Sequence, residues 1–161
     1  MLKILNSFKP FFEDTHREYS VREYGRICKV SPPTASTFLK KAENQGILLS
    51  KKQGIYIFYR ANRNSSFFKD IAKTYWRLTL KQIMGEMNKD FLFKKPILFG
   101  SVAKAENTAE SDLDIFVDIN KRSINLENIE KKLKRNIQIH FKNSLNNENL
   151  KKNIENGVII E

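Results

Sequence analysis

Residues 99–117, FGSVAKAENTAESDLDIFV, decide the fold of the second half of the chain. A Gly-Ser pair follows an apolar run, and after ten further residues Asp112 and Asp114 alternate with apolar side chains. Because successive side chains of a strand point to opposite faces, both carboxylates share one face and the apolar residues share the other. Two neighbouring carboxylates repel each other unless a cation lies between them. The stretch therefore predicts a strand, a Gly-Ser turn into a short helix, and a second strand with a cation site.

The chemistry of these side chains favours Mg²⁺ and a phosphate group. Mg²⁺ prefers hard oxygen ligands and is usually held by one or two carboxylates together with substrate phosphates. Gly100 lets the backbone approach a phosphate closely, and N–H groups at the start of the following helix can receive it. We therefore predict metal ligation by Asp112 and Asp114, and phosphate contacts by Gly100 and Ser101. A capping or turn role for the aspartates is the weaker interpretation, since a carboxylate in an apolar strand is costly without a partner.

These residues also resemble a known family. Gly100-Ser101, the ten-residue gap and Asp112-x-Asp114 resemble the DNA polymerase β-like nucleotidyltransferase superfamily, and especially its minimal MNT antitoxin-type members. The resemblance runs from about Pro96 to Glu161. It implies Mg²⁺ as cofactor, a nucleoside triphosphate such as ATP as substrate, and transfer of an AMP-like group to a hydroxyl. It further implies a tyrosine of a HEPN-type toxin as acceptor, or a small molecule as in more distant relatives.

The third carboxylate of that family has no counterpart in this chain. Three carboxylates hold two metal ions in the family, and Asp112 and Asp114 correspond to the first two. The position of the third falls on Gln138, which is neutral and cannot act as a general base. His140 lies on the same strand face and could accept a proton. Two hypotheses stay open: an active site with Asp112, Asp114 and His140 as catalytic residues, and a site that binds nucleotide without catalysis.

Lys104 and Ala105, which follow the Gly-Ser pair, also bear on nucleotide binding. Lys104 is available for the triphosphate, although a solvated loop lysine is an equal alternative. The glycine that the family usually has four residues after the serine is Ala105 here, which we expect to stiffen or reshape the phosphate loop. We therefore assign nucleotide binding to Gly100, Ser101 and Lys104.

The charge of the chain is concentrated in its first part. Residues 1–95 contain 19 Lys and Arg against 8 Asp and Glu, whereas residues 96–161 contain 10 of each, so the whole net charge of +11 lies before residue 96. This asymmetry favours a nucleic-acid-binding module joined to a nearly neutral one, with a solubilising surface as the alternative. The lone Cys28 excludes an intramolecular disulfide and fits a reducing compartment. No apolar run approaches the ~20 residues of a membrane span. We expect a cytoplasmic protein with no membrane association.

The first 64 residues have the pattern of a DNA-binding domain. A capping box at Ser20 starts a helix to about Cys28, with Val21, Tyr24 and Ile27 facing a core. Ser31 then caps a second helix that ends near Asn44. Apolar runs on both sides of a polar turn over 51–54 predict a β-hairpin. Two helices followed by a two-stranded wing resemble the winged helix-turn-helix domains of MarR-like regulators.

The second helix and the hairpin supply the candidate DNA contacts. Small hydroxyl side chains near the start of a recognition helix suit phosphates and base edges in the major groove, and lysines at a wing tip suit backbone phosphates. The predicted contacts to double-stranded DNA are Thr34, Ser36, Thr37, Lys40, Lys41, Lys51, Lys52 and Arg60. A winged helix used for protein contacts is the alternative.

The expected fold class is therefore α+β. A winged helix-turn-helix over 1–64 precedes a connector over 65–95, which contains a long helix capped by Ser66 and extending to about Asp90. A small α/β polymerase β-like domain follows over 96–161, with the order β-α-β-α-β-α-β. We expect the apolar face of the connector helix either to pack on the wing or the second domain or to take part in dimerisation, and we expect a homodimer.

Two functions follow from this organisation. The first is a DNA-binding nucleotidyltransferase that acts as an antitoxin on a HEPN-type partner. The second is a catalytically inactive transcriptional regulator whose second domain senses a nucleotide or binds a partner protein.

Overall fold

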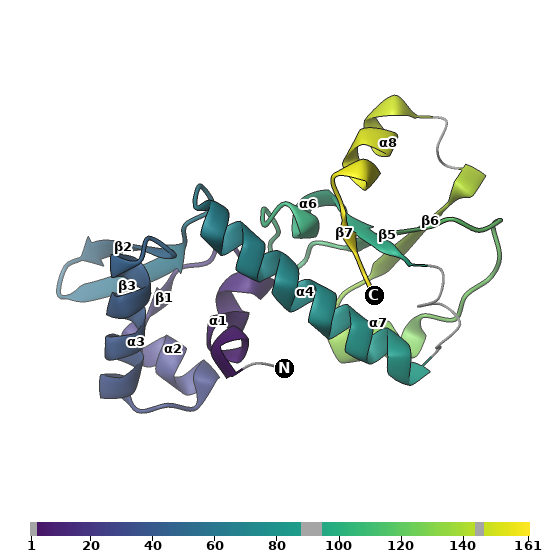
Figure 1. Cartoon of the computed structure of the whole chain (residues 1–161). Helices are drawn as coiled ribbons and strands as arrows, with labels where there is room; N and C mark the ends of the chain where they lie inside the picture. The colour runs from purple at the N-terminus through teal and green to yellow at the C-terminus, as the bar shows by residue number, and fades with distance from the viewer. Residues whose placement is uncertain (1–2, 88–94, 144–146) are drawn as a thin grey trace. The chain divides into compact units, whose positions relative to one another are not determined.

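A computed structural model describes residues 3–87, 95–143 and 147–161 (Figure 1). The chain forms two compact units. Unit 1 comprises Met1–Ala72 together with Ala105–Ala109, and unit 2 comprises Lys73–Lys104 together with Glu110–Glu161. Unit 1 is therefore not one continuous stretch, because it includes part of the segment between the Gly-Ser pair and the two aspartates.

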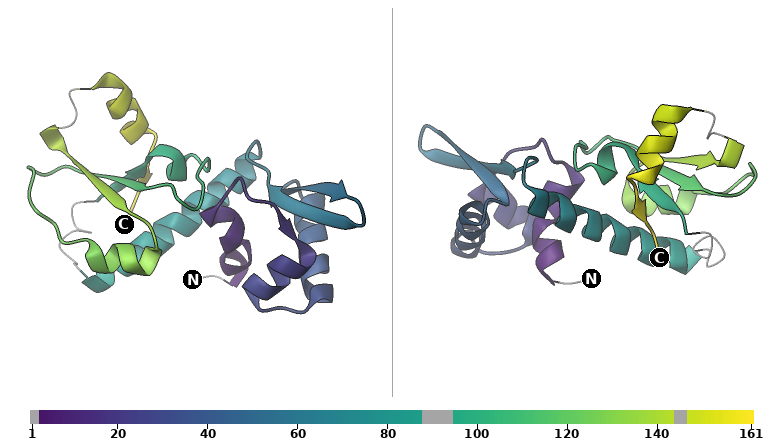
Figure 2. Two further views of the ribbon diagram at one scale, coloured as in Figure 1. Left: turned by 180° about the vertical axis from the view of Figure 1, so that it is seen from behind. Right: turned by 45° about the horizontal axis from the view of Figure 1, so that its top comes forward.

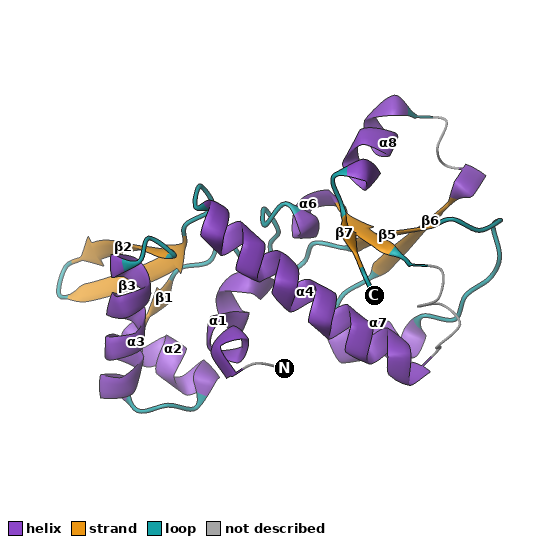
Figure 3. Ribbon diagram, in the orientation of Figure 1, coloured by secondary structure: helices purple, strands orange, loops and turns teal. Residues whose placement is uncertain are grey.

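Unit 1 contains helices and a small antiparallel sheet of strand order β1-β3-β2. Its elements are α1 (Lys3–Glu13), β1 (Tyr19–Ser20), α2 (Val21–Cys28), α3 (Pro32–Asn44), β2 (Leu48–Gln53) and β3 (Tyr56–Ala61). Figure 3 shows β2 and β3 as a hairpin that follows the three helices in the chain. The helices predicted over 21–28 and 32–44 are thus confirmed.

Side-chain caps start both of these helices. Ser20 Oγ accepts a hydrogen bond from the Glu23 N–H at 3.2 Å, and Ser31 Oγ accepts one from the Thr34 N–H at 3.4 Å. A capping box has two hydrogen bonds, and at Ser20 the structure shows the one from the Glu23 N–H to the serine hydroxyl. The Glu23 carboxylate accepts a hydrogen bond from Arg17 Nη2 at 2.6 Å in place of one from the Ser20 N–H. A single serine at each start therefore satisfies one of the free N–H groups of the first turn.

The hairpin turn lies further along the chain than the sequence predicts. Lys51 and Lys52 belong to β2 and pair with residues of β3, so the turn consists of Gly54 and Ile55. Gly54 has a φ of +59°, the left-handed conformation that two-residue hairpin turns require. The predicted hairpin with Gly54 in its turn is confirmed, but residues 51–53 belong to β2 and not to the turn, because pairing along the strand outweighs the polar composition of this stretch.

Aromatic rings form the core of unit 1. Neighbouring rings lie with their centroids 4.8 to 5.9 Å apart. The rings involved are Phe8, Phe11, Phe12, Tyr19, Tyr24, Phe38 and Phe68. Of the α2 residues expected to face a core, Tyr24 is buried, but Ile27 is 48% exposed. The α2 face toward the core is therefore narrower than predicted.

Unit 2 is built on a sheet of strand order β6-β5-β4-β7, in which only β5 and β6 run parallel. Its elements are β4 (Ile97–Phe99), α6 (Gly100–Ala103), β5 (Leu113–Val117), α7 (Glu127–Leu133), β6 (Ile137–Phe141), α8 (Glu148–Glu155) and β7 (Val158–Ile159). The predicted β-α-β-α-β-α-β order is confirmed. Figures 1 and 2 show α8 on one side of the sheet and α7 on the other.

The long helix α4 (Ser66–Met87) begins in unit 1 and continues into unit 2. Its cap is Ser65 rather than the predicted Ser66, because Ser65 Oγ accepts the Phe68 N–H at 3.3 Å. The predicted end near Asp90 lies outside the described residues. In unit 2, Trp76 and Leu80 are buried on its apolar face. No helix in the described part of the chain has the length and apolar character needed to cross a membrane.

Candidate functional site

The Gly-Ser pair and the second aspartate lie next to each other in unit 2. Strands β4 and β5 are antiparallel, and Phe99 pairs with Asp114. Gly100 is the residue after Phe99, so its backbone lies beside Asp114. Gly100 has a φ of +77°, and a Cβ atom there would collide with Oδ2 of Asp114. The Asp114 carboxylate therefore rests against the Gly100 backbone, a contact that only glycine permits.

The first aspartate lies just outside the strand. Strand β5 begins at Leu113, so the prediction that Asp112 lies within it was wrong by one residue. Both aspartates are half-buried. The alternating residues Leu113, Ile115 and Val117 are fully buried, as the period-2 pattern predicts. The two carboxylates thus remain accessible, while the strand beneath them is fixed in the core.

Strand β6 provides a hydrogen-bonding or ion-pair partner for each carboxylate. Asp114 pairs with Gln138 across the parallel strands. Gln138 Nε2 donates a hydrogen bond to Asp112 Oδ2 at 2.7 Å, and His140 Nε2 lies 3.3 Å from Asp114 Oδ1. The His140 ring packs edge-on against Phe99, with centroids 4.9 Å apart. The arrangement thus combines two carboxylates, an amide and an imidazole on one face of the sheet.

The residues after Gly100 differ in their surroundings. Ser101 lies in the short helix α6 and is half-buried. Lys104 is exposed, and its Nζ donates a hydrogen bond to Asn153 Oδ1 of α8 at 2.9 Å. Ala105 is buried and has a φ of +57°. This left-handed conformation costs a residue with a Cβ atom roughly 1–2 kcal/mol, so glycine would fit the position with less strain.

Arg135 is a residue of this site that the sequence pattern did not indicate. Helix α7 ends at Leu133, and Lys134 takes a left-handed conformation with a φ of +54°. Arg135 is only 7% exposed, its guanidinium lies 5.4 Å from the Trp76 ring centroid, and Nη1 donates to the Ser111 carbonyl at 2.6 Å. It thereby fixes the residue before Asp112. A lone arginine at the end of a lysine-rich stretch gives no sequence signal of this role.

The donor set fits one magnesium ion. Asp112 and Asp114 offer hard oxygen ligands on one face, and Mg²⁺ needs only one or two carboxylates when phosphates complete its shell. Over residues 3–87, 95–143 and 147–161, no cluster of three His, Cys, Asp or Glu side chains could hold a metal ion. The described residues therefore do not provide a three-carboxylate site for two ions, since Gln138 occupies the position opposite Asp114.

The candidate DNA contacts on α3 lie mainly on its exposed side. Thr34, Thr37, Lys40 and Lys41 are exposed, and Ser36 is half-buried. The Thr34 hydroxyl lies 2.8 Å from the hydroxyl of the capping residue Ser31. The two lysines are therefore free to meet phosphates, whereas Thr34 already has a local partner.

The candidate contacts on the hairpin divide between its two faces. Directly paired residues, and residues two apart on one strand, point to the same face of a sheet. Leu49 pairs with Arg60 and lies two residues before Lys51, so these three residues share one face of the hairpin. Lys52 lies on the other face, together with Ser50 and the buried Tyr59. The Ser50 side chain is hydrogen-bonded to Glu43 of α3, so this second face meets α3. The structure therefore places Lys51 and Arg60 on one face of the hairpin and Lys52 on the other.

Comparison with known proteins agrees with the site in unit 2. A family model described as "Polymerase beta, Nucleotidyltransferase" matches residues 81–161, which is half of the chain. The match begins within α4 and includes the Gly-Ser pair, both aspartates and β6. No curated protein matches the chain. The chain therefore belongs to the polymerase beta nucleotidyltransferase family.

Proposed function

We propose that this chain is a DNA-binding nucleotidyltransferase that transfers an AMP-like group to a hydroxyl acceptor. The donor is a magnesium nucleoside triphosphate, and ATP is the favoured one. The observation that supports this most is the contact between Asp114 and Gly100. It joins a carboxylate suited to Mg²⁺ with a turn suited to a phosphate in one small region of unit 2. The functional division that we propose is 1–64 for DNA binding, 65–95 as connector and 96–161 for transfer.

Each residue of the site has a proposed role. Asp112 and Asp114 would hold Mg²⁺, which neutralises charge on the triphosphate when bound. The Gly100 backbone and Ser101 would receive phosphate oxygens. Lys104 would add a cation to the triphosphate by exchanging its present partner, Asn153 Oδ1, for a phosphate oxygen.

The transfer needs a group that accepts a proton. The acceptor hydroxyl oxygen attacks the α-phosphorus, a new O–P bond forms, and the bond to the β-phosphate oxygen breaks to release pyrophosphate. We assign the hydroxyl proton to His140, whose Nε2 lies 3.3 Å from Asp114 Oδ1. When Nε2–H donates to Asp114, the other ring nitrogen is free to accept a proton, and the carboxylate stabilises the resulting imidazolium.

Gln138 favours a second candidate function. The amide at this position donates to Asp112 Oδ2 where the family has its third carboxylate. An amide is a poorer ligand for a divalent cation than a carboxylate and cannot take up a proton. The chain would then be a catalytically inactive transcriptional regulator whose second unit senses a nucleotide or binds a partner protein.

Labelled nucleotide separates the two functions. The full chain is incubated with Mg²⁺, radiolabelled ATP and the protein encoded beside it, with a tyrosine of a HEPN-type toxin as the first acceptor to test. We expect label transfer by the wild type, none by the Asp112→Asn/Asp114→Asn double variant, and faster transfer by Gln138→Asp. The control is Asp118→Asn, because this exposed carboxylate only pairs with Lys142 at 3.7 Å.

Calorimetric titration with ATP completes the test. Binding that requires both aspartates, without transfer to any acceptor, would support the regulator. Absence of ATP binding with and without Mg²⁺, or unchanged binding in the double variant, would contradict both functions.

The DNA-binding part of the proposal rests on charge and exposure. All of the net positive charge lies before residue 96, and Lys40 and Lys41 are exposed on α3. Phosphate contacts release condensed counterions, so log affinity falls with log salt with a slope of about −0.9 per contact. A homodimer would place two such helices on half-sites about 34 Å apart or a multiple of that spacing.

Fluorescence anisotropy of a labelled duplex, measured from about 50 to 300 mM salt, tests this part. Lys40→Gln/Lys41→Gln should weaken binding to all sequences and make the slope shallower by about 2, corresponding to two lost phosphate contacts. Lys151→Gln/Lys152→Gln on α8 makes the same charge change and should leave the slope unaltered. Equal effects of both pairs, or no binding at the lowest salt, would leave the basic unit without DNA as its partner.

A further inference from the structure

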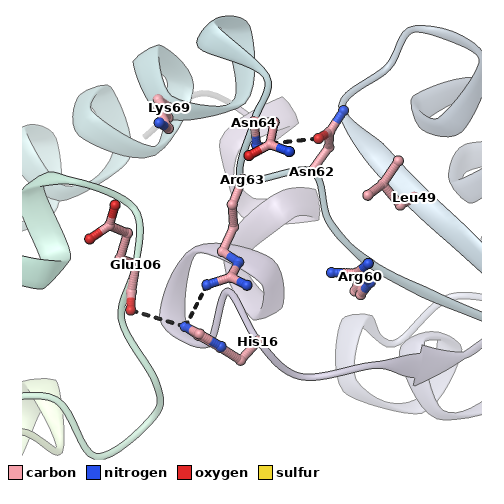
Figure 4. A pocket seen from close by; sticks show the side chains of 8 residues that line it. All are labelled: His16, Leu49, Arg60, Asn62, Arg63, Asn64, Lys69 and Glu106. Atoms are coloured by element: carbon pink, nitrogen blue, oxygen red, sulfur yellow. Dashed lines mark hydrogen bonds between the residues drawn. The ribbon is translucent and has the colours of Figure 1, made fainter.

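A cavity of about 500 Å³ in unit 1 contains none of the residues proposed for nucleotidyl transfer (Figure 4). Its wall is formed by side chains of β2, β3, the loop after β3, the start of α4, the loop after α1 and the segment 105–109. Pockets of roughly 300–1,000 Å³ typically hold small molecules. A ligand the size of a phosphorylated metabolite fits this volume, whereas a double helix does not enter it.

The cavity wall has an excess of positive charge. Arg60, Arg63 and Lys69 contribute three cations, against the single carboxylate of Glu106. Arg60 makes only a loose ion pair, with its Nε 3.9 Å from Glu18 Oε1. Among the residues that the structure describes, no carboxylate forms an ion pair with Arg63 or Lys69. Two cations of the wall are therefore available to an anion.

The present partner of Arg63 is a weak competitor for such an anion. Arg63 Nη1 lies 2.9 Å from His16 Nε2, and the Glu106 carbonyl oxygen lies 3.1 Å from the same nitrogen (Figure 4). An arginine only donates and a carbonyl only accepts, so one ring nitrogen cannot form hydrogen bonds with both. A phosphate oxygen that accepts from Arg63 would leave His16 free to donate to Glu106. Anion binding would therefore satisfy all three groups.

The wall formed by segment 105–109 is held in place by buried hydrogen bonds. Asn107 is fully buried, and its Nδ2 donates to the carbonyls of Phe12 and Glu13, each at 3.0 Å. Thr15 donates to the Asn107 carbonyl from both its N–H and its hydroxyl, each at 2.9 Å. A site whose wall is fixed before binding loses less entropy when the ligand binds.

The position of the cavity separates it from the proposed DNA surface. Leu49 and Arg60 line the cavity and lie on the hairpin face opposite to the face that meets α3. DNA bound along α3 would therefore leave the cations of the cavity wall, Arg60 among them, available to another ligand. Arg60 is therefore better explained as part of the cavity than as a contact of the wing with DNA.

We propose that this cavity binds a small oligophosphate, either free pyrophosphate or the polyphosphate tail of a nucleotide. Two or three linked phosphates provide several negative charges for the three cations. The planar guanidinium groups of Arg60 and Arg63 suit phosphate oxygens, and Lys69 adds a point charge. The site lies outside the proposed transfer chemistry and would bind its ligand without Mg²⁺.

Calorimetry on the full chain tests the proposal independently of the transfer site. The Asp112→Asn/Asp114→Asn protein in metal-free, phosphate-free buffer is titrated with pyrophosphate, ATP and AMP. We expect pyrophosphate and ATP to bind, with Arg63→Gln and Lys69→Gln each weakening binding about tenfold through loss of a charge-assisted contact. Lys151→Gln on α8 serves as the matched control and should bind like the parent. Circular dichroism checks that each variant is folded.

The outcomes distinguish the sources of the phosphate. Equal affinity for pyrophosphate and ATP supports recognition of the phosphates alone, whereas ATP binding that is about tenfold tighter supports the nucleotide as the source. The proposal is overturned if pyrophosphate does not bind at about 50 mM salt, where screening is weak. Equal binding of AMP, or affinities unchanged in both variants, also overturns it. Loss of duplex binding in Arg63→Gln without any pyrophosphate binding would assign the cavity to DNA instead.

Discussion

Replacing Gly100 with alanine tests the contact between the Gly-Ser turn and Asp114. The left-handed conformation at Gly100 costs alanine about 1–2 kcal/mol, of which about 0.4–1 kcal/mol is regained from the less flexible unfolded chain. The added methyl group also collides with Asp114 Oδ2, and such overpacking costs about 1–3 kcal/mol. We expect the free energy of unfolding to fall by about 2–3 kcal/mol in total. The displaced carboxylate should also weaken Mg-ATP binding about tenfold or more.

The hairpin glycine provides the matched control. Gly54 has a φ of +59°, and a Cβ atom there would meet nothing within 4 Å. Gly54→Ala should therefore pay only the backbone cost, about 0.5–1 kcal/mol. Urea unfolding followed by far-UV circular dichroism measures both variants, and Trp76 fluorescence reports on unit 2. Equal losses in the two variants would refute the packing of Asp114 on Gly100, and undiminished Mg-ATP binding in Gly100→Ala would remove Gly100 from the site.

Three further predictions concern other parts of the chain. Arg135→Gln should lower the free energy of unfolding by about 2 kcal/mol and weaken Mg-ATP binding, because it removes the hydrogen bond to Ser111, the residue before Asp112. Urea unfolding and calorimetry measure the two quantities, and no change in either would contradict this prediction. Lys134→Gly should raise the free energy of unfolding by roughly 1 kcal/mol, since it relieves left-handed strain, and the melting temperature should rise with it. Lys151→Gly inside α8 should lower the free energy of unfolding by a similar amount, and the melting temperature should fall. Burial raises the pKa of Tyr19 to about 12. Its neutral form therefore contributes full stability below about pH 10, where the unfolded phenol keeps its proton, and that stability is lost as the pH rises toward 12. Tyr19→Phe should flatten the fall in unfolding free energy over this range by about 1 kcal/mol per pH unit, and an unchanged slope would contradict the assignment.

Local chemistry made much of the fold predictable from sequence. Serine caps indicated the starts of α2 and α3, and strict alternation indicated β5 with Asp114 on its half-buried face. These signals act within a few residues, so they survive in any tertiary context. The errors came where pairing over distance decides the structure. Lys51 and Lys52 look like turn residues, but they extend β2 because β3 offers backbone partners along its whole length.

The same distinction applies to the sites. The Gly-Ser pair, the aspartates and the position of Gln138 follow from motif spacing and strand register. By contrast, Arg135 acts through a ring and a carbonyl that are distant in sequence, so composition gave no hint of its burial. The cavity of unit 1 combines residues from six separate segments, among them His16 and Glu106. No sequence pattern joins such positions, because only folding brings them together.

Asn107 also determines which parts of the chain can be separated. A fragment that stops before residue 105 would lose the hydrogen bonds that Asn107 forms with the fully buried Thr15 and with the carbonyls of Phe12 and Glu13. Grafting the first half onto another domain would therefore require segment 105–109 to be transplanted with it. The ten-residue spacing between Ser101 and Asp112 consequently meets two demands at once. It sets the distance between turn and carboxylates in unit 2, and it reaches the end of α1 in unit 1.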